Sequence, residues 1–338
     1  MLTCEKLLKK GCIKVIGNYL KLAQLQEISG VKKHTLNARL NNLYSKKELQ
    51  RTSGNQIILN PAQCKSLIKN QIIEPRGKII YIGNLKGGVG KTTLSFLLAN
   101  TLSSIGIKTC AVDLDVQANL TNQFMQPESE QIVFYNIIKG DAKIQSSIVN
   151  IKECLDLIPS SLTNSLIEKI LATQRPKHYL RWFNNLFLNY LRKTYDVIIV
   201  DNPPSLNTLN SIFSLSLIDR DNIIIPVNPE EFSIKGVQMF LEDINEIRTE
   251  YNTTSNPNIT ILMNRFFQNQ KTNLEILLKM GSLFGDSFSD IVIKDSAKLR
   301  ESVNEKLSIS NIKKAKDIYE TLRELLIELK ILVSVRGE

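Results

Sequence analysis

The pattern of apolar and polar positions along the chain changes near residue 76. The segment before it is helical in pattern, whereas the chain after it alternates short apolar runs with longer segments of 3.6-residue periodicity. Several of the short runs are almost continuously apolar, which is typical of parallel strands buried on both faces. The predicted strands are Lys78 to Ile82, Thr109 to Val112, Val197 to Val200, Ile223 to Val227 and Ile259 to Met263.

Alternating strands and helices predict an α/β fold with a doubly wound, mostly parallel sheet that helices cover on both faces. The cluster Glu74-Pro75-Arg76-Gly77 breaks the pattern directly before the first predicted strand. We therefore expect two domains, a small helical one at residues 1–76 and the larger α/β domain at residues 77–338.

The charge of the chain is concentrated in the first of these domains. The whole chain has a net charge of +10, and residues 1–76 hold 14 Lys and Arg against 4 Asp and Glu, which accounts for all of it. A domain this basic is typical of a protein with a polyanion partner, and nucleic acid is the commonest one in the cytosol. A basic surface that meets only solvent is the alternative.

Two further patterns narrow the class of protein. No run approaches the roughly 18 apolar residues of a membrane helix, and the N-terminus has no signal-peptide pattern, so we expect a cytoplasmic protein. The cysteines are scattered without a C-x-x-C pair, which argues against a zinc site, an iron–sulfur site or a disulfide framework. They are Cys4, Cys12, Cys64, Cys110 and Cys154.

A glycine-rich loop lies between the first predicted strand and a helical pattern at Thr92 to Ser103. Strand, loop and helix in this order are typical of a phosphate-binding loop, because glycines let backbone N–H groups converge on phosphate oxygens at a helix N-terminus. We expect Lys91 to neutralise the β- and γ-phosphates of a nucleotide and Thr92 to bind Mg²⁺. A plain glycine turn would not account for these two residues. The loop reads Lys86-Gly87-Gly88-Val89-Gly90-Lys91-Thr92-Thr93.

The loop departs from the standard phosphate-loop pattern at two positions. Leu85 stands where that pattern has glycine, and a second lysine, Lys86, follows it. The resulting motif K-G-G-x-G-K-[ST] resembles the deviant Walker A signature of the ParA-type partition ATPases. The resemblance implies that residues 87–93 bind ATP and that ATP binding produces a homodimer. In this family the first lysine reaches the phosphates held by the partner copy, which makes Lys86 the candidate for that role.

Two later segments are similar to acidic motifs of the same family. The segment from Asp113 to Asn119 resembles D-x-D-P-Q-x-N, with Val116 where proline is usual. By resemblance, Asp115 orients the attacking water and Asp113 supports the magnesium shell. The run from Tyr195 to Ser205 has the form of a Walker B strand, which makes Asp201 the expected outer-shell magnesium ligand.

The nucleoside side of the site is also implied by resemblance. Pro226 to Phe232 resembles a segment that packs near the nucleoside, and Asn264 matches an asparagine that contacts adenine in relatives. A strand-end asparagine is equally common in turns, so the base contact is the least specific part of the predicted site. Asn202 replaces the commoner threonine of the family.

The basic N-terminal segment contains the outline of a helix-turn-helix from Leu22 to Leu40, with Gly30 in the turn. Leu36, Leu40 and Leu43 are expected to face inward, and residues 51–56 could form a basic wing or turn. The arrangement is similar to that of the larger ParA-type proteins, which carry an N-terminal operator-binding domain with which they repress their own operon. A helical packing module is the alternative. The expected contacts to a DNA major groove and its phosphates are Lys32, Lys33, His34, Asn37 and Arg39.

ATP-bound ParA dimers also coat DNA without sequence preference. By resemblance, Arg248, Lys271 and Lys298 are the basic residues for this contact, although each also fits an ordinary solvated charge.

The last predicted helix, near Ile318 to Leu332, has an apolar stripe and an acidic polar face. An acidic face disfavours anionic lipid, so we expect the stripe to pack on the core and not on a membrane.

The combined expectation is a partition ATPase whose cargo is a plasmid or chromosome and whose hydrolysis is stimulated by a centromere-binding protein of ParB type. Such a protein would act in the cytoplasm on the nucleoid. Two alternatives stay open, a deviant Walker ATPase that positions a protein cargo and a transcriptional repressor with a nucleotide-controlled dimerisation switch.

Overall fold

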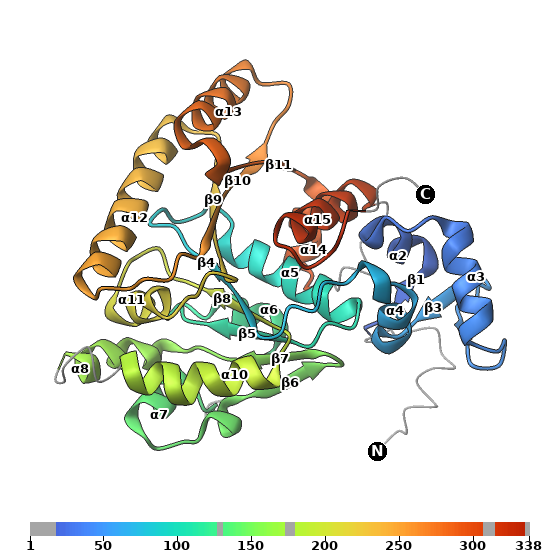
Figure 1. Cartoon of the computed structure of the whole chain (residues 1–338), viewed down its shortest axis with the longest axis horizontal. Coiled ribbons are helices and arrows are strands. Elements are labelled where there is room, and N and C mark those ends of the chain that lie inside the picture. Colours follow the sequence, from blue (N-terminus) through green and yellow to red (C-terminus); the bar gives the residue numbers. More distant parts are fainter. Residues whose placement is uncertain (1–17, 127–130, 173–179, 307–314, 335–338) are drawn as a thin grey trace.

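The computed structural model describes residues 18–126, 131–172, 180–306 and 315–334, and one eight-stranded sheet runs through its larger part (Figure 1). The strand order is β11-β10-β9-β4-β8-β5-β7-β6, and all neighbours are parallel except β6 and β7. The predicted mostly parallel α/β sheet is confirmed. The strands are β4 (Lys78–Ile82), β5 (Thr109–Asp113), β6 (Val149–Lys152), β7 (Leu155–Ile158), β8 (Val197–Asp201), β9 (Asn222–Val227), β10 (Asn258–Phe266) and β11 (Phe288–Lys294).

All five strands predicted from apolar runs form, and β5 and β8 each extend by one residue to include the aspartates Asp113 and Asp201. The prediction missed β6, β7 and β11. β6 and β11 end the sheet and bury few side chains, so they lack a continuous apolar run. The run of β7 is only four residues long and is interrupted by Asp156.

Two hydrophobic cores separate at the sheet because side chains alternate along each strand. In β4, Ile80 and Ile82 belong to one core, and Ile79 and Tyr81 belong to the other. The first core includes residues of α5 (Lys91–Ser104), α6 (Asn119–Phe124), α14 (Ala297–Asn304) and α15 (Lys316–Glu328). The second includes residues of α7 (Phe134–Lys139), α8 (Ile167–Leu171), the π-helix η4 (Phe183–Leu188), α10 (Asn189–Thr194), α11 (Thr208–Leu215), α12 (Glu231–Glu250) and α13 (Lys271–Phe284).

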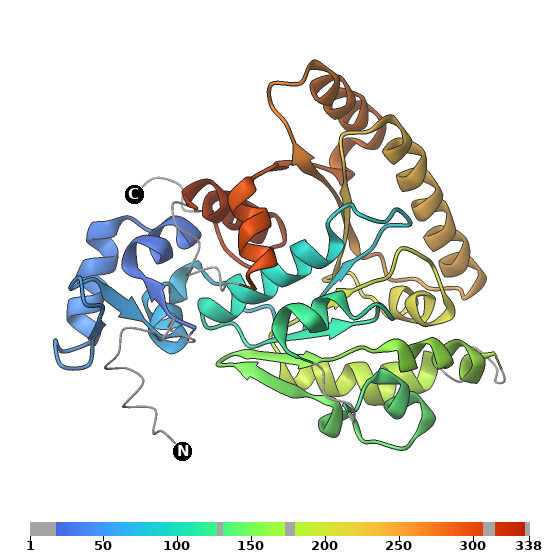
Figure 2. The same ribbon diagram turned by 180° about the vertical axis from the view of Figure 1, so that it is seen from behind.

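Residues 18–76 form a small N-terminal unit beside α5 and α15 (Figures 1 and 2). Its two longer helices are joined at Gly30, whose φ of +72° is readily accessible to glycine. Leu36 and Leu40 are buried as predicted, but Leu43 is 53% exposed, because it ends its helix beyond the small core. The elements are β1 (Leu20–Lys21), α2 (Leu22–Ser29), α3 (Lys33–Leu43), β2 (Gln50–Arg51), β3 (Ile57–Leu59) and α4 (Pro61–Leu67).

This N-terminal unit shares the first hydrophobic core with the larger part of the chain. Helices α2 and α15 pack together, and Gln24 Nε2 donates to the Tyr319 hydroxyl at 2.8 Å. Ser104, the last residue of α5, donates to Asn18 Oδ1 at 2.6 Å. The apolar stripe of α15 is buried in this junction, at Leu322, Leu325 and Leu329, which confirms that it packs on the core.

Candidate functional site

The glycine-rich loop lies at the carboxyl end of β4 and leads into α5, as predicted. Gly88 and Gly90 have φ angles of +73° and +94°, in the region that other residues rarely adopt. A Cβ added to Gly87 or Gly88 would meet no atom within 4 Å, so space beside the loop is open for a ligand. The loop therefore has both the backbone shape and the free volume that a phosphate site requires.

Lys91 and Thr92 begin α5 and have different contacts. The buried Lys91 amine donates to the carbonyl oxygens of Asn84 at 3.1 Å and Lys86 at 3.0 Å, so this side chain is folded over its own loop. Burial lowers the pKa of Lys91, and the nearby carboxylates Asp201 and Asp115 oppose that shift. The Thr92 hydroxyl donates to Asp201 at 2.8 Å, while the next residue, Thr93, is half-buried.

Asp113 and Asp201 end neighbouring strands, and both carboxylates are fully buried. Asp201 accepts a second hydrogen bond from the Ser95 hydroxyl at 2.8 Å. Burial raises the pKa of both carboxyl groups, and the charge of Asp201 adds to the increase at Asp113. Two buried carboxylates beside a threonine hydroxyl form an oxygen donor set that suits Mg²⁺, so these residues fit the predicted metal.

Asp113 also organises the turn that carries Asp115. Its carboxylate accepts from the Thr121 backbone at 2.8 Å, from the Thr121 hydroxyl at 2.7 Å and from the Asp115 backbone at 3.1 Å. Asp115 in turn accepts from the Gln117 backbone at 2.9 Å. Asp113 therefore holds the turn that carries Asp115 in place through these hydrogen bonds.

Lys86 points in a different direction from Lys91. Its amine forms an ion pair with Glu230, the residue directly before α12, and its side chain is 34% exposed. The hydrogen bond from Lys86 is the main reason that the pKa of Glu230 is lowered. The two lysines of the loop are therefore separated, one buried in the loop and one on its outer side.

Asn264 lies on β10 and contacts the loop itself. Its side-chain amide is buried and donates to the carbonyl oxygen of Val89 at 2.7 Å. In this structure Asn264, the residue expected to contact a base, is hydrogen-bonded to the backbone of the phosphate loop.

Comparison with known proteins identifies the family to which this site belongs. Residues 77–261, more than half of the chain, match the family described as "AAA domain". The sporulation initiation inhibitor protein Soj of Bacillus subtilis is 32% identical over 235 residues, which cover 67% of this chain and 87% of Soj. The chromosome-partitioning ATPase Soj of Treponema pallidum is 29% identical over 240 residues, which cover 70% of this chain and 90% of that protein.

The chain belongs to the ParA-type family of partition ATPases. Among solved structures, a plasmid partition protein from Borrelia burgdorferi bound to AMPPNP is 27% identical and superposes with a TM-score of 0.58, covering 74% of this chain and 98% of that one.

Sequence reasoning missed three residues that shape this ParA-type site. Ser95 follows Lys91 by one helical turn, a spacing that places it on the same face of α5, toward Asp201. Thr121 lies two residues into α6 and gave no pattern of its own. Glu230 was part of the segment expected near the nucleoside, but the pattern gave no reason to pair it with Lys86.

The candidate DNA contacts of the N-terminal unit differ in their surroundings. Lys32, Lys33 and His34 are exposed at the start of α3, and Asn37 is half-buried one turn later. Arg39 was expected to meet DNA as well, but its guanidinium bonds to Leu67 O at 2.7 Å and to Gln71 at 3.0 Å. Arg39 is half-buried, and these contacts direct one of its guanidinium nitrogens toward the end of α4.

The candidates for non-specific DNA contact also differ. Arg248 is only 8% exposed, and its guanidinium donates to the carbonyl oxygens of Ser214 and Ser255. The assignment of Arg248 to DNA is therefore wrong. Its place in the helix explains this, because it continues the buried face of α12. Lys271 is 92% exposed and lies 3.8 Å from Glu275, and Lys298 is exposed on α14.

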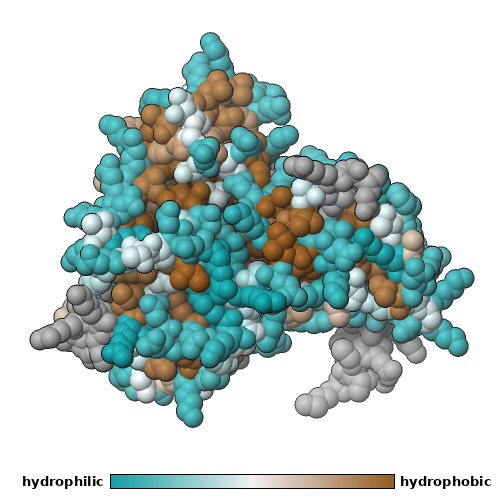
Figure 3. All heavy atoms as spheres, in the orientation of Figure 1, coloured by the Kyte–Doolittle hydropathy of each residue, from teal (hydrophilic) through white to brown (hydrophobic). Residues whose placement is uncertain are grey.

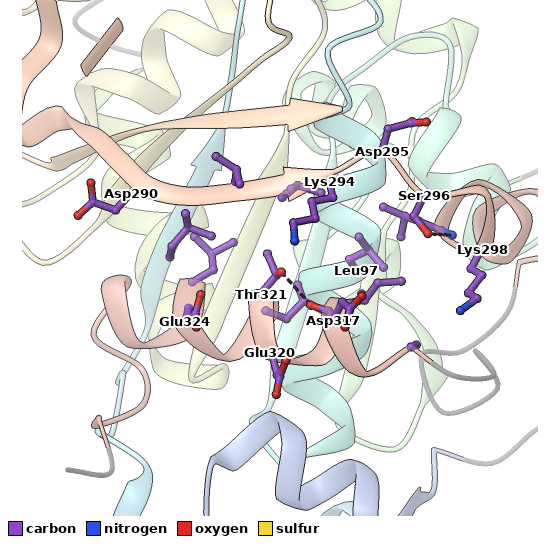
Figure 4. A pocket seen from close by; sticks show the side chains of 18 residues that line it. Leu97, Asp290, Lys294, Asp295, Ser296, Lys298, Asp317, Glu320, Thr321 and Glu324 are labelled. Atoms are coloured by element: carbon purple, nitrogen blue, oxygen red, sulfur yellow. Dashed lines mark hydrogen bonds between the residues drawn. The ribbon is translucent and has the colours of Figure 1, made fainter. Parts of the chain in front are cut away.

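A cavity of about 420 Å³ lies away from the phosphate loop, between β11 and α15. Figure 4 shows the carboxylates of Asp317 and Glu324 on α15 and the amine of Lys294 on β11 around it. Leu97 of α5 also lines it.

Within the described part of the chain, no helix is both long and apolar enough to cross a bilayer.

Proposed function

We propose that this protein is a Mg²⁺-dependent ATPase that partitions a plasmid or chromosome by ATP-dependent dimerisation on DNA. The separation of the two loop lysines carries the proposal. Lys91 is buried in its own loop, whereas Lys86 is partly exposed and is held outside it by Glu230. A site with one inward and one outward lysine suits a nucleotide that two copies of the chain enclose.

Each residue of the site has a physical role in this proposal. The loop N–H groups and Lys91 would hold the phosphates, and Asp115 would orient the attacking water, since phosphoryl transfer depends mainly on positioning and charge. Thr92 and, through water, Asp201 would hold Mg²⁺, with Asp113 supporting that arrangement. When bound, this ion would offset the negative charge of the phosphate oxygens.

The surface near Lys86 supports a second copy as the partner. Phe232, two residues after Glu230, is 79% exposed, and Glu231 forms an ion pair with Lys279 of α13. Figure 3 shows hydrophobic residues among hydrophilic ones on the side of the molecule that α12 and α13 form. Exposed apolar side chains beside a charged site are typical of a protein interface.

The N-terminal unit is proposed to be a winged helix-turn-helix that binds the operator of its own operon. Lys32, Lys33, His34 and Asn37 would contact DNA from the start of α3. The turn between β2 and β3, where Arg51 bonds to Asn55, would be the wing. Two helices joined at a glycine and an excess of basic residues support this assignment.

Non-specific DNA binding is proposed for Lys271 and Lys298 in the ATP-bound dimer. A centromere-binding protein of ParB type would stimulate hydrolysis, and the protein would act in the cytoplasm on the nucleoid.

Three variants test the dimer. Lys91→Ala is expected to lose ATP binding, Asp115→Ala to bind ATP and accumulate as a dimer with hydrolysis reduced by about 100-fold or more, and Lys86→Ala to bind ATP but stay monomeric. Light scattering with and without ATP measures the mass, and nucleotide titration measures affinity. An ATP-dependent dimer of Lys86→Ala as stable as that of the unaltered protein would contradict the proposal.

Two other functions stay open and are separable. A protein cargo would be favoured if no gene for a centromere-binding protein lay beside this one. A repressor with a nucleotide switch would be favoured if a Lys91→Ala strain regained plasmid retention when both partition proteins were expressed from an unrelated promoter.

A further inference from the structure

Asn264 lies at an irregular point of its strand. The pairing of β10 with β11 shifts register between Met263 and Phe266, and Arg265 between them has a φ of +53°. A bulge of this kind re-aims the side chains around it. Here the amide of Asn264 reaches the phosphate loop and donates to Val89 O at 2.7 Å.

The fit between Asn264 and the loop is tight. A Cβ added to Gly90 would lie 2.2 Å from Asn264 Nδ2, and the φ of Gly90 is +94°. Position 90 therefore requires glycine for two reasons, its backbone conformation and the amide packed against it.

The bond to Val89 O fixes one particular peptide unit. In a planar trans peptide the C=O and N–H point to opposite sides. When Asn264 holds the Val89 carbonyl toward β10, the N–H of Gly90 must point away from β10. This N–H directly precedes Lys91 and Thr92, at the beginning of α5.

We propose that Asn264 is a positioning residue for phosphate binding, which sets the direction of the Gly90 N–H so that it donates to a phosphate oxygen. This role differs from a contact with the base, and it rests on the proposed ATP site. The energetic reason is preorganisation, because a loop already held in its binding shape loses less freedom when the ligand arrives.

The two roles predict different ligand dependence. We compare Asn264→Ala and Asn264→Leu, whose side chain is similar in size and uncharged but cannot donate, with the unaltered protein and with Asn269→Ala, an exposed asparagine beyond the same strand. Affinities are measured for ATP, GTP and tripolyphosphate in the presence of Mg²⁺. Hydrogen exchange of the amides of residues 87–92 is measured in parallel without nucleotide.

If Asn264 positions the loop, both variants should weaken ATP and tripolyphosphate by the same factor, about tenfold, and leave the ratio of ATP to GTP affinity unchanged. Exchange in the loop should become faster, and Asn269→Ala should behave as the unaltered protein. A loss for ATP without a loss for tripolyphosphate would overturn the proposal in favour of a base contact, and unchanged affinities would overturn it outright. An unaltered protein that binds none of the three ligands would instead overturn the ATP site itself.

Discussion

At the scale of single residues, three charged side chains have structural contacts within the protein and do not face a ligand. Arg248, Lys152 and Arg192 each direct their charged groups into the protein. Arg192 meets the buried carboxylate of Asp221, whereas the other two meet neutral oxygen atoms. Charge alone therefore does not identify a DNA contact in this chain.

Replacing Arg248 by alanine should destabilise the fold and leave DNA binding to the folded protein unchanged. The substitution leaves the buried carbonyl oxygen of Ser214 and the partly buried one of Ser255 without this donor, which costs about 2 kcal/mol. Urea unfolding measures the loss, and Lys271→Ala, at an exposed site, is the matched control with a change below about 0.5 kcal/mol. Equal stability of the two variants would contradict the structural role of Arg248.

Lys152 should make stability depend on pH. Its amine contacts Asn100 Oδ1 at 2.5 Å, and burial lowers the pKa of Lys152 to about 7 from an unfolded value of 10.5. Between these values the unfolded chain holds the proton more tightly, so the free energy of unfolding gains a contribution that rises as pH increases from 7 to 10.

The variant Lys152→Met has no titrating amine at this position, so this pH dependence is lost. Because it buries no protonated amine, it should be more stable than the unaltered protein by about 1 kcal/mol or more at pH 7, and the difference should shrink toward pH 10. Urea unfolding at four pH values measures both curves. A difference that stays constant with pH would show that Lys152 keeps its ordinary pKa.

At the scale of elements, α5 connects the phosphate loop to the N-terminal unit. The helix begins at Lys91 in the nucleotide site and ends at Ser104, which bonds to Asn18. Gly106 follows with a φ of +81°, and a Cβ there would lie 2.4 Å from the carbonyl oxygen of Pro61 in α4. The close approach of α4 to the end of α5 depends on this glycine.

Gly106→Ala should therefore separate α4 from α5 and lower stability by about 3 kcal/mol, from backbone strain and the clash together. Gly236→Ala is the control, because it lies within α12 with no atom near its added Cβ and should gain about 0.8 kcal/mol in helix propensity. Thermal unfolding compares the two. A neutral Gly106→Ala would mean that the α4–α5 contact is loose.

The elements also show why sequence reasoning succeeded in some places and not in others. Central strands were predictable because burial on both faces leaves a continuous apolar run, as in Val197 to Val200. The phosphate loop was predictable because its glycines and Lys91 follow from the chemistry of phosphate binding, whereas the expectation for Lys86 rested on the family resemblance. The Lys86–Glu230 and Asn264–Val89 contacts join residues more than 140 positions apart, and no local pattern carries that information.

At the scale of the whole molecule, the predicted boundary near residue 76 crosses a shared core. Leu25 and Ile28 of α2 lie in the same cluster as Leu322 and Leu326 of α15. The backbone of Ile73 also bonds to that of Ile331, after α15, at 2.9 Å. Removing residues 1–76 would therefore expose an apolar surface on the ATPase part, and lost activity of the truncated chain would not identify the function of the N-terminal unit.

Charge reversal on the surface avoids this difficulty. Lys32→Glu with Lys33→Glu changes only exposed side chains, so stability should stay within about 0.5 kcal/mol of the unaltered value. Reversing two phosphate contacts should abolish binding to a fragment of the protein's own promoter and preserve ATP-dependent binding to random DNA, since the second activity is assigned to Lys271 and Lys298. Gel-shift titration at several salt concentrations measures both.

The control pair Lys169→Glu with Lys193→Glu makes the same change of charge on α8 and α10, and it should affect neither activity. If the control pair weakens promoter binding equally, the effect comes from net charge, and α3 is not the operator-binding helix.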